Sequence, residues 1–256
     1  MASSATNHDT DPLKSPSSGK ELFPATQWSV ISRARGEDDA QMTAALRKLA
    51  LNYWRPLYLY LRKRGEEHED AADAVQGFFG FVFSSGFLEH VEREGGKFRS
   101  YLLSSLERWR SRERVKAGAQ KRGGRVLHVP LEAVEAMQES VALSDEQASP
   151  EAAYDRQWAV EMVALAVQGV HAEYQRRGRE AWFEQLAAAL PGGGELRPYA
   201  ELAASLESSE GAVKKAVFDL RAAFATRLRE EIRATVRSNE DAEEELRYLV
   251  TVMSKA

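Results

Sequence analysis

The stretch from Lys97 to Arg125 combines basic side chains with aromatic rings in a way that could bind nucleic acid. It holds ten basic residues and two acidic ones, an excess of +8 in a chain whose net charge is −4. Basic groups neutralise phosphates, and aromatic rings stack on unpaired bases. The residues predicted to face DNA are Lys97, Arg99, Tyr101, Arg108, Trp109, Arg112, Lys116, Lys121 and Arg122. In the alternative interpretation the arginines only solvate an exposed helix face; in either case Phe98 and Leu102 are expected to be core.

Two apolar stripes predict a second DNA-binding element near the C-terminus. The first comprises Tyr199, Leu202, Ala203 and Leu206, and the second comprises Val213, Val217, Leu220, Phe224 and Leu228. Only Glu207, Ser208 and Ser209 interrupt the pattern. Two helices joined by so short a turn must cross at a steep angle, which is the helix-turn-helix arrangement.

The second of these helices carries polar and basic residues off its apolar stripe. Ser208 or Ser209 is placed to cap the helix, and its basic side chains could contact phosphates or guanines. The residues predicted to contact duplex DNA are Ser209, Glu210, Gly211, Lys214, Lys215, Phe218 and Arg221. An ordinary helical hairpin with a solvated lysine pair is the alternative.

The residue types that catalysis needs are not grouped in a catalytic pattern. The chain has no cysteine, and its five histidines are scattered without metal-ligand spacing. The glycines at 192–194 lack the lysine and Ser/Thr of a phosphate loop. We interpret the acidic residues from Glu243 to Glu245 as a solvated helix face. The sequence therefore predicts a protein that is not an enzyme and uses no cofactor or metal.

Helical periodicity dominates the elements that must position these residues. We expect an all-α protein of two small helical domains joined by an acidic linker, with helices near 67–83, 98–117 and 240–253 and turns at Pro56 and Gly65. The expected organisation is a disordered tail over 1–20, a first domain over 21–125, the linker over 126–156, a second domain over 157–237 and a helical extension over 238–256. Because no segment reads as a signal peptide or membrane span, we expect a soluble, cytoplasmic protein.

Five short motifs occur in a familiar order. They are Phe23-Pro24-x-Thr26-x-Trp28-Ser29, Asp70-x-x-Asp73-x-x-Gln76-x-x-Phe79, Lys-Phe-Arg-Ser-Tyr-Leu-Leu at 97–103, Gln-Lys-Arg-Gly-Gly at 120–124 and Ser-Glu-Gly-Ala-Val-Lys at 209–214. Together they resemble the extracytoplasmic-function (ECF) sigma factors of bacterial RNA polymerase, which belong to the sigma-70 family. The resemblance covers roughly residues 23–233.

The resemblance implies a role for each segment. Asp70, Asp73, Gln76 and Phe79 would dock on core RNA polymerase. The basic aromatic segment of a sigma2-like domain would melt and read the minus-ten promoter element, and a sigma4-like helix-turn-helix would read the minus-thirty-five element. The protein would then start transcription in the cytoplasm, at the nucleoid, while polymerase performs the bond chemistry. The tail before Phe23 and the helix after Glu240 are where an anti-sigma factor or a regulatory kinase could act.

Some positions depart from the family's pattern, and two other functions stay open. Gly77 and Gly80 lie where helix formers are usual, Arg112 lies where an acidic residue is common, and Glu207 occupies a turn that often holds glycine. One alternative is a helix-turn-helix regulator that binds duplex DNA without polymerase. The other is a helical adaptor that binds only protein through its basic face.

Overall fold

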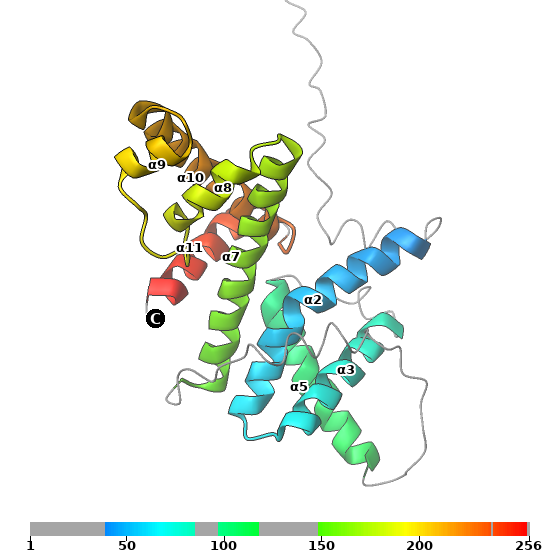
Figure 1. Cartoon of the computed structure of the whole chain (residues 1–256). Coiled ribbons are helices and arrows are strands. Elements are labelled where there is room, and N and C mark those ends of the chain that lie inside the picture. Colours follow the sequence, from blue (N-terminus) through cyan, green and yellow to red (C-terminus); the bar gives the residue numbers. More distant parts are fainter. Residues whose placement is uncertain (1–38, 85–96, 118–147, 237, 255–256) are drawn as a thin grey trace, which may run out of the picture.

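The structure, a computed structural model of the 256-residue chain, describes residues 39–84, 97–117, 148–236 and 238–254. Every regular element within these ranges is a helix (Figure 1), which confirms the predicted all-α class for this part of the chain. The predicted tail over 1–20, the motif at 23–29, most of the acidic linker, and Lys121 and Arg122 lie outside the described residues.

Three helices form the first helical group: α2 (Asp39–Lys63), α3 (His68–Ser84) and α5 (Phe98–Ala117). The predicted bounds of α5 agree with the structure. Its core residues Phe98, Leu102 and Leu106 recur every fourth position, so they share one face, and all three are buried. Phe98 also meets Tyr53 of α2 edge-on, with ring centroids 5.1 Å apart. The interpretation of Phe98 and Leu102 as core residues is confirmed.

Pro56 was predicted to mark a turn, but it lies inside α2. A proline at this position cannot donate the helical hydrogen bond to the carbonyl of Asn52, which costs roughly 3 kcal/mol in an isolated helix. The neighbouring Trp54 and Leu57 are almost completely buried. Packing of this face therefore outweighs the local preference, and the helix continues to Lys63. The predicted turn at Gly65 is present, with a φ of 85°.

The long helix α7 (Pro150–Arg176) connects the first helical group to a second one (Figure 1). Ser149 caps it by accepting a hydrogen bond from the Ala152 N–H at 3.1 Å, and Pro150 occupies the first turn. The helix thus begins within the segment predicted to be linker. Its first half packs on α2 through Trp158 and Met162. Its second half contributes Val170 and Tyr174 to a separate core.

The second group contains α8 (Glu180–Leu186), the 3-10 turn η1 (Ala187–Ala189), α9 (Tyr199–Ser205) and α10 (Glu210–Arg233). The apolar stripe predicted for α9 and the first part of the stripe predicted for α10 lie in one core with residues of α7. Like α7, α10 belongs to both cores: Val213 and Leu220 lie in the second, while Leu228 and Ile232 lie in the first. Two shared helices therefore join the two groups.

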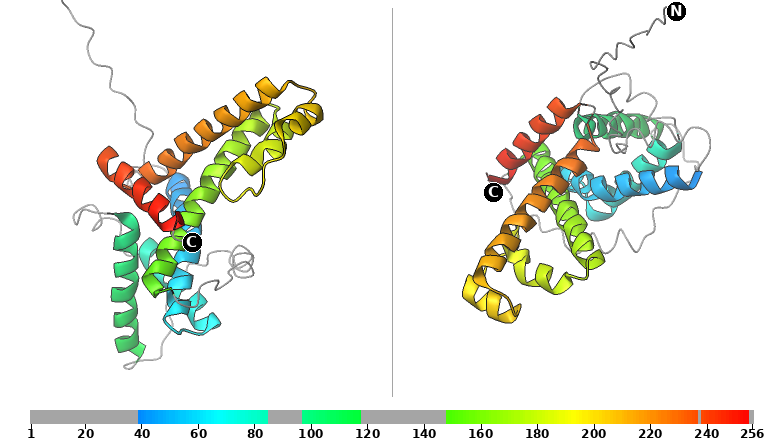
Figure 2. Two further views of the ribbon diagram at one scale, coloured as in Figure 1. Left: turned by 90° about the vertical axis from the view of Figure 1, so that its left-hand side faces the viewer. Right: turned by 90° about the horizontal axis from the view of Figure 1, so that it is seen from above.

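The final helix, α11 (Asn239–Ser254), folds back from the end of α10 (Figure 2). Its buried residues include Ala242 and Leu249, which belong to the first core. This position brings α11 against both α10 and α7. Among the described residues, no helix has the length and apolar character that crossing a membrane requires.

Candidate nucleic-acid interface

A short turn joins α9 to α10 at the place where the sequence predicts a helix-turn-helix. Glu207 adopts a left-handed backbone conformation with a φ of 48°, in the turn where glycine is common. Two residues later, Ser209 is the N-cap of α10 and accepts a hydrogen bond from the Ala212 N–H at 3.2 Å. Leu202 and Val213, on either side of the turn, are completely buried. The turn is therefore fixed by packing on both sides despite the unfavourable φ of Glu207.

The outer face of α10 presents the residues predicted to contact duplex DNA. Phe218 is the most unusual of them, because 72% of its surface is exposed. Lys214 is exposed and extends over the Tyr199 ring, with its Nζ 5.7 Å from the ring centroid. Lys215 is exposed and pairs with Asp219 at 2.6 Å. The two lysines could contact phosphates of the DNA backbone. The exposed Phe218 ring could contact a thymine methyl group.

The remaining predicted residues of this face lie at its two ends. Ser209, Glu210 and Gly211 are exposed in the first turn of α10. A Cβ added at Gly211 would meet only the Ser209 Oγ, at 4.0 Å, so internal packing does not require a glycine. At the other end the Arg221 Nε donates a hydrogen bond to the Ala189 carbonyl at 3.1 Å, which draws this side chain toward η1.

The first turn of α5 is buried by other parts of the chain, in contrast to the prediction for Arg99. Its guanidinium donates from Nε to Glu245 Oε2 at 2.7 Å, pairs with Asp155 and lies over the Tyr248 ring at 4.2 Å. Only 8% of Arg99 is exposed. The prediction that Arg99 contacts DNA does not agree with this position, since the residue links α5, α7 and α11.

Lys97 contacts the same group of side chains, which we call the Arg99 cluster and which comprises Lys97, Arg99, Asp155, Glu245 and Tyr248. Lys97 pairs with Glu244 at 2.8 Å and with Glu245 at 2.9 Å. Burial opposes the charged form of Lys97, but the hydrogen bonds to the two glutamates outweigh it and raise the Lys97 pKa. For Arg99, likewise, burial opposes the charge, whereas Glu245 and Asp155 raise the pKa above its usual range. Glu245 is 1% exposed, so the interpretation of Glu243 to Glu245 as a solvated face is wrong for this residue.

Along the rest of α5 the predicted DNA-facing residues divide into packed and exposed ones. Trp109 is half-buried against Phe78, with ring centroids 5.9 Å apart, and its ring fills the space that a Cβ on Gly77 would need. Tyr101 is also half-buried, under the exposed Arg108 at 5.7 Å. This close approach favours glycine at position 77, because a Cβ there would require the Trp109 ring to shift by a few tenths of an ångström.

Farther along α5, Arg112 and Lys116 are exposed, and Lys116 pairs with Glu113 at 2.8 Å. Two other arginines of this helix, Arg110 and Arg114, both pair with Glu66. Part of the positive excess of the segment is therefore met by acidic residues of the chain itself.

The four residues predicted to dock on polymerase do not share one face of α3. Asp70 and Asp73 are exposed and Gln76 is half-buried, but Phe79 is completely buried in the first core. Nine helical residues turn by about 900°, so Phe79 lies on the side opposite Asp70. The exposed acidic pair can meet a partner, whereas Phe79 is a core residue.

Asp155, Glu245 and Tyr248, which complete the Arg99 cluster, were not predicted as interacting residues. Tyr248 donates a hydrogen bond to Asp155 Oδ2 at 2.5 Å. Their sequence separation from Arg99 hides the association, because no local pattern links them. The sequence offered one hint: Glu245 is followed three positions later by the aromatic Tyr248, in a helix that is otherwise acidic in its first half. The described residues hold no group of three or more acidic or histidine side chains that could ligate a metal ion.

No family model matches the chain, and no curated protein or solved structure matches it either.

Proposed function

We propose that the protein binds promoter DNA as an ECF-type sigma factor: it joins core RNA polymerase, recognises a promoter and starts transcription without being an enzyme itself. The observation that carries this proposal is the outer face of α10. A helix-turn-helix whose second helix exposes Lys214 and Phe218 suits a major groove. The order of the sequence motifs supports a partnership with polymerase.

The acidic pair on α3 supports the same proposal. Asp70 and Asp73 are exposed on the helix that the family resemblance assigns to polymerase docking. Arg108, Arg112 and Lys116 are exposed along α5 and could meet phosphates of promoter DNA. In this arrangement Lys97 and Arg99 do not contact DNA. Their ion pairs with α11 and α7 position α5 instead.

A helix-turn-helix regulator that acts without polymerase is the second candidate. The burial of Arg99 and Phe79 favours it. The sigma-factor proposal expects these two residues to contact DNA and polymerase, but both are buried within the protein. The continuity of α7 and α10 through both cores also favours it, since it joins the two groups of helices firmly.

A run-off transcription assay separates the two candidates. The full chain is added to core bacterial RNA polymerase and a library of promoter fragments, and transcripts are sequenced. The sigma-factor proposal expects transcripts that begin at particular promoters and need both proteins. If the chain binds duplex DNA but yields no such transcript, the regulator is the better description. The absence of salt-dependent DNA binding would instead favour the protein-binding adaptor, because phosphate contacts make DNA affinity fall as the salt concentration rises.

A further inference from the structure

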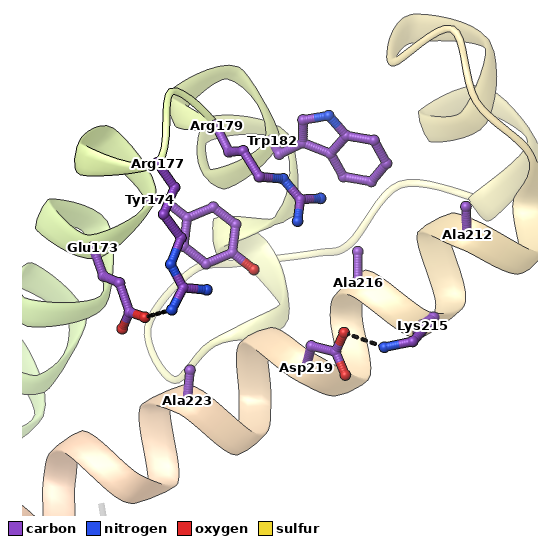
Figure 3. A pocket seen from close by; sticks show the side chains of 10 residues that line it. All are labelled: Glu173, Tyr174, Arg177, Arg179, Trp182, Ala212, Lys215, Ala216, Asp219 and Ala223. Carbon is purple, nitrogen blue, oxygen red and sulfur yellow. Dashed lines mark hydrogen bonds and ion pairs between the residues drawn. The ribbon is translucent and has the colours of Figure 1, made fainter.

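A cavity of about 350 Å³ lies between the end of α7, the start of α8 and one flank of α10 (Figure 3). Two aromatic residues, Tyr174 and Trp182, and three cationic ones, Arg177, Arg179 and Lys215, contribute to its walls. Lys215 is also one of the residues predicted to contact duplex DNA. The cavity therefore lies beside the outer face of α10.

The three cations of the cavity differ in how their charges are met. Arg177 pairs with Glu173 along α7, and Lys215 pairs with Asp219 along α10. Arg179 has no carboxylate within ion-pair distance in the part of the chain that the structure describes. Its guanidinium instead lies over the Trp182 ring at 4.8 Å and over the Tyr174 ring at 5.8 Å. In Figure 3 it extends between these two rings into the cavity.

Such a guanidinium is prepared to receive an anion. The two rings restrict its orientation, and its N–H groups can donate two parallel hydrogen bonds to phosphate or carboxylate oxygens. Holding the side chain in place beforehand reduces the entropy that binding would otherwise lose. The charged residues of the wall sum to +1, because Arg177, Arg179 and Lys215 face only Glu173 and Asp219.

The Tyr174 hydroxyl is a second donor directed into the same space (Figure 3). The residue is only 8% exposed, and its hydroxyl makes no hydrogen bond within the described residues. Burial raises the pKa of this phenol above its usual value, so the hydroxyl keeps its proton at neutral pH. It can therefore donate to an anion that Arg179 holds.

We propose that this cavity binds a phosphate group, with Arg179 and the Tyr174 hydroxyl as its donors and Lys215 at its rim. The identity of the phosphate as part of DNA rests on the proposed function. A duplex in contact with the outer face of α10 would bring backbone phosphates close to Lys215. Free inorganic phosphate is the other source of the same chemistry. A backbone phosphate held here would fix the register of α10 on the duplex.

The test follows the Trp182 indole N–H by NMR in the full chain, with Trp182→Phe to assign the resonance. The protein is titrated with inorganic phosphate and, separately, with duplex DNA. The informative variants are Arg179→Gln and Tyr174→Phe. Arg176→Gln is the matched control, because Arg176 is exposed at the end of α7 and does not line the cavity. Duplex affinity is measured in parallel over a range of salt concentrations.

The proposal expects the Trp182 resonance to shift in the wild type and in Arg176→Gln, and to respond weakly in Arg179→Gln. With duplex, Arg179→Gln should lower the affinity roughly tenfold. It should also reduce the salt slope by about 0.9, the contribution of one phosphate. Tyr174→Phe should weaken binding without changing that slope, since it removes a donor but no charge.

The possible failures point to different conclusions. A Trp182 response to inorganic phosphate in a protein that binds no duplex supports the cavity as a phosphate site, while the duplex binding required by the proposed function fails. If Lys214→Ala weakens duplex binding but Arg179→Gln changes neither affinity nor slope, and Trp182 is silent in both titrations, the proposed function stands and the phosphate site is refuted. Equal Trp182 shifts in the wild type and Arg179→Gln also refute it.

Discussion

Arg99 Nε donates to Glu245 Oε2 across 2.7 Å and so joins the first turn of α5 to the middle of α11. Both side chains are almost excluded from water, with exposed fractions of 9% and 2%. Asp155 of α7 completes the contact, so one guanidinium connects three helices. An ion pair of this kind gives little net stability over apolar packing, but it is costly to break on one side only.

Replacing Glu245 by glutamine should therefore destabilise the fold strongly. The variant leaves the Arg99 charge buried with Asp155 as its remaining carboxylate, and we expect a loss of about 3 kcal/mol in the free energy of unfolding. Urea denaturation followed by circular dichroism measures this loss. Glu244→Gln is the matched control, because Glu244 is exposed and, within the described ranges, pairs with Lys97 alone; this substitution should change stability little. Equal effects of the two substitutions would contradict the role assigned to Arg99.

Glu66 provides a test that depends on pH. Burial disfavours its ionised form, but Arg110 and Arg114 outweigh burial and lower the Glu66 pKa from its ordinary value of 4.5. Because the folded pKa is the lower one, this carboxylate stabilises the fold above about pH 4.5, and the contribution disappears as pH falls through the folded pKa. It connects the turn after α2 to α5.

Glu66→Gln should accordingly lower the stability at pH 7 by about 1 kcal/mol. The difference from the wild type should shrink as the pH is lowered below 4.5. Denaturation curves at several pH values measure it, with the exposed neighbour Glu67→Gln as control. A difference that stays constant with pH would show that the ion pairs with α5 do not stabilise the protein.

The helices themselves could largely be predicted from the sequence, because apolar periodicity is a local property. Phe98, Leu102 and Leu106 define α5, and the stripes of α9 and α10 led to their contact across a short turn. Pro56 was misinterpreted because burial of its neighbours, which is a tertiary effect, overcame the local preference of proline. The start of α7 was missed although Ser149 and Pro150 are typical of a helix N-terminus, because the surrounding acidic residues indicated a linker.

The candidate sites were less predictable, since they depend on contacts between distant segments. Basic residues of α5 were expected to face DNA, but Arg99 meets carboxylates that lie 56 and 146 positions away. No local pattern indicates such a pairing. The resemblance assigned Phe79 and Asp70 to one docking contact, although a helix of 3.6 residues per turn places positions nine residues apart on opposite sides. Arg179 received no role because its aromatic partners Tyr174 and Trp182 become neighbours only when α7 and α8 fold together.

The outer face of α10 leads to a prediction about duplex binding. Lys214→Ala and Phe218→Ala should each weaken binding to a recognised duplex, by about 1 to 3 kcal/mol where a base edge is contacted. Both side chains are exposed, so the fold should be unaffected. Arg229→Ala is the control, because Arg229 is an exposed cation near the other end of the same helix. Fluorescence anisotropy with a selected duplex measures affinity, and an equal loss in all three variants would indicate nonspecific attraction.

Asp73 tests the proposed contact with polymerase separately from DNA. The residue is exposed on α3 and its carboxylate has no role in the core, so Asp73→Lys should change the free energy of unfolding by no more than about 0.5 kcal/mol. Reversing the charge should nevertheless weaken binding to core RNA polymerase by at least tenfold, because a cationic partner surface would then be repelled. Glu184→Lys makes the same charge change on α8, away from the proposed contact, and should bind as the wild type does.

Pull-down and biolayer interferometry with core enzyme compare the three proteins. If folded Asp73→Lys binds polymerase as well as the wild type does, the docking surface does not include this part of α3. If both variants lose binding, the effect comes from the change in net charge alone.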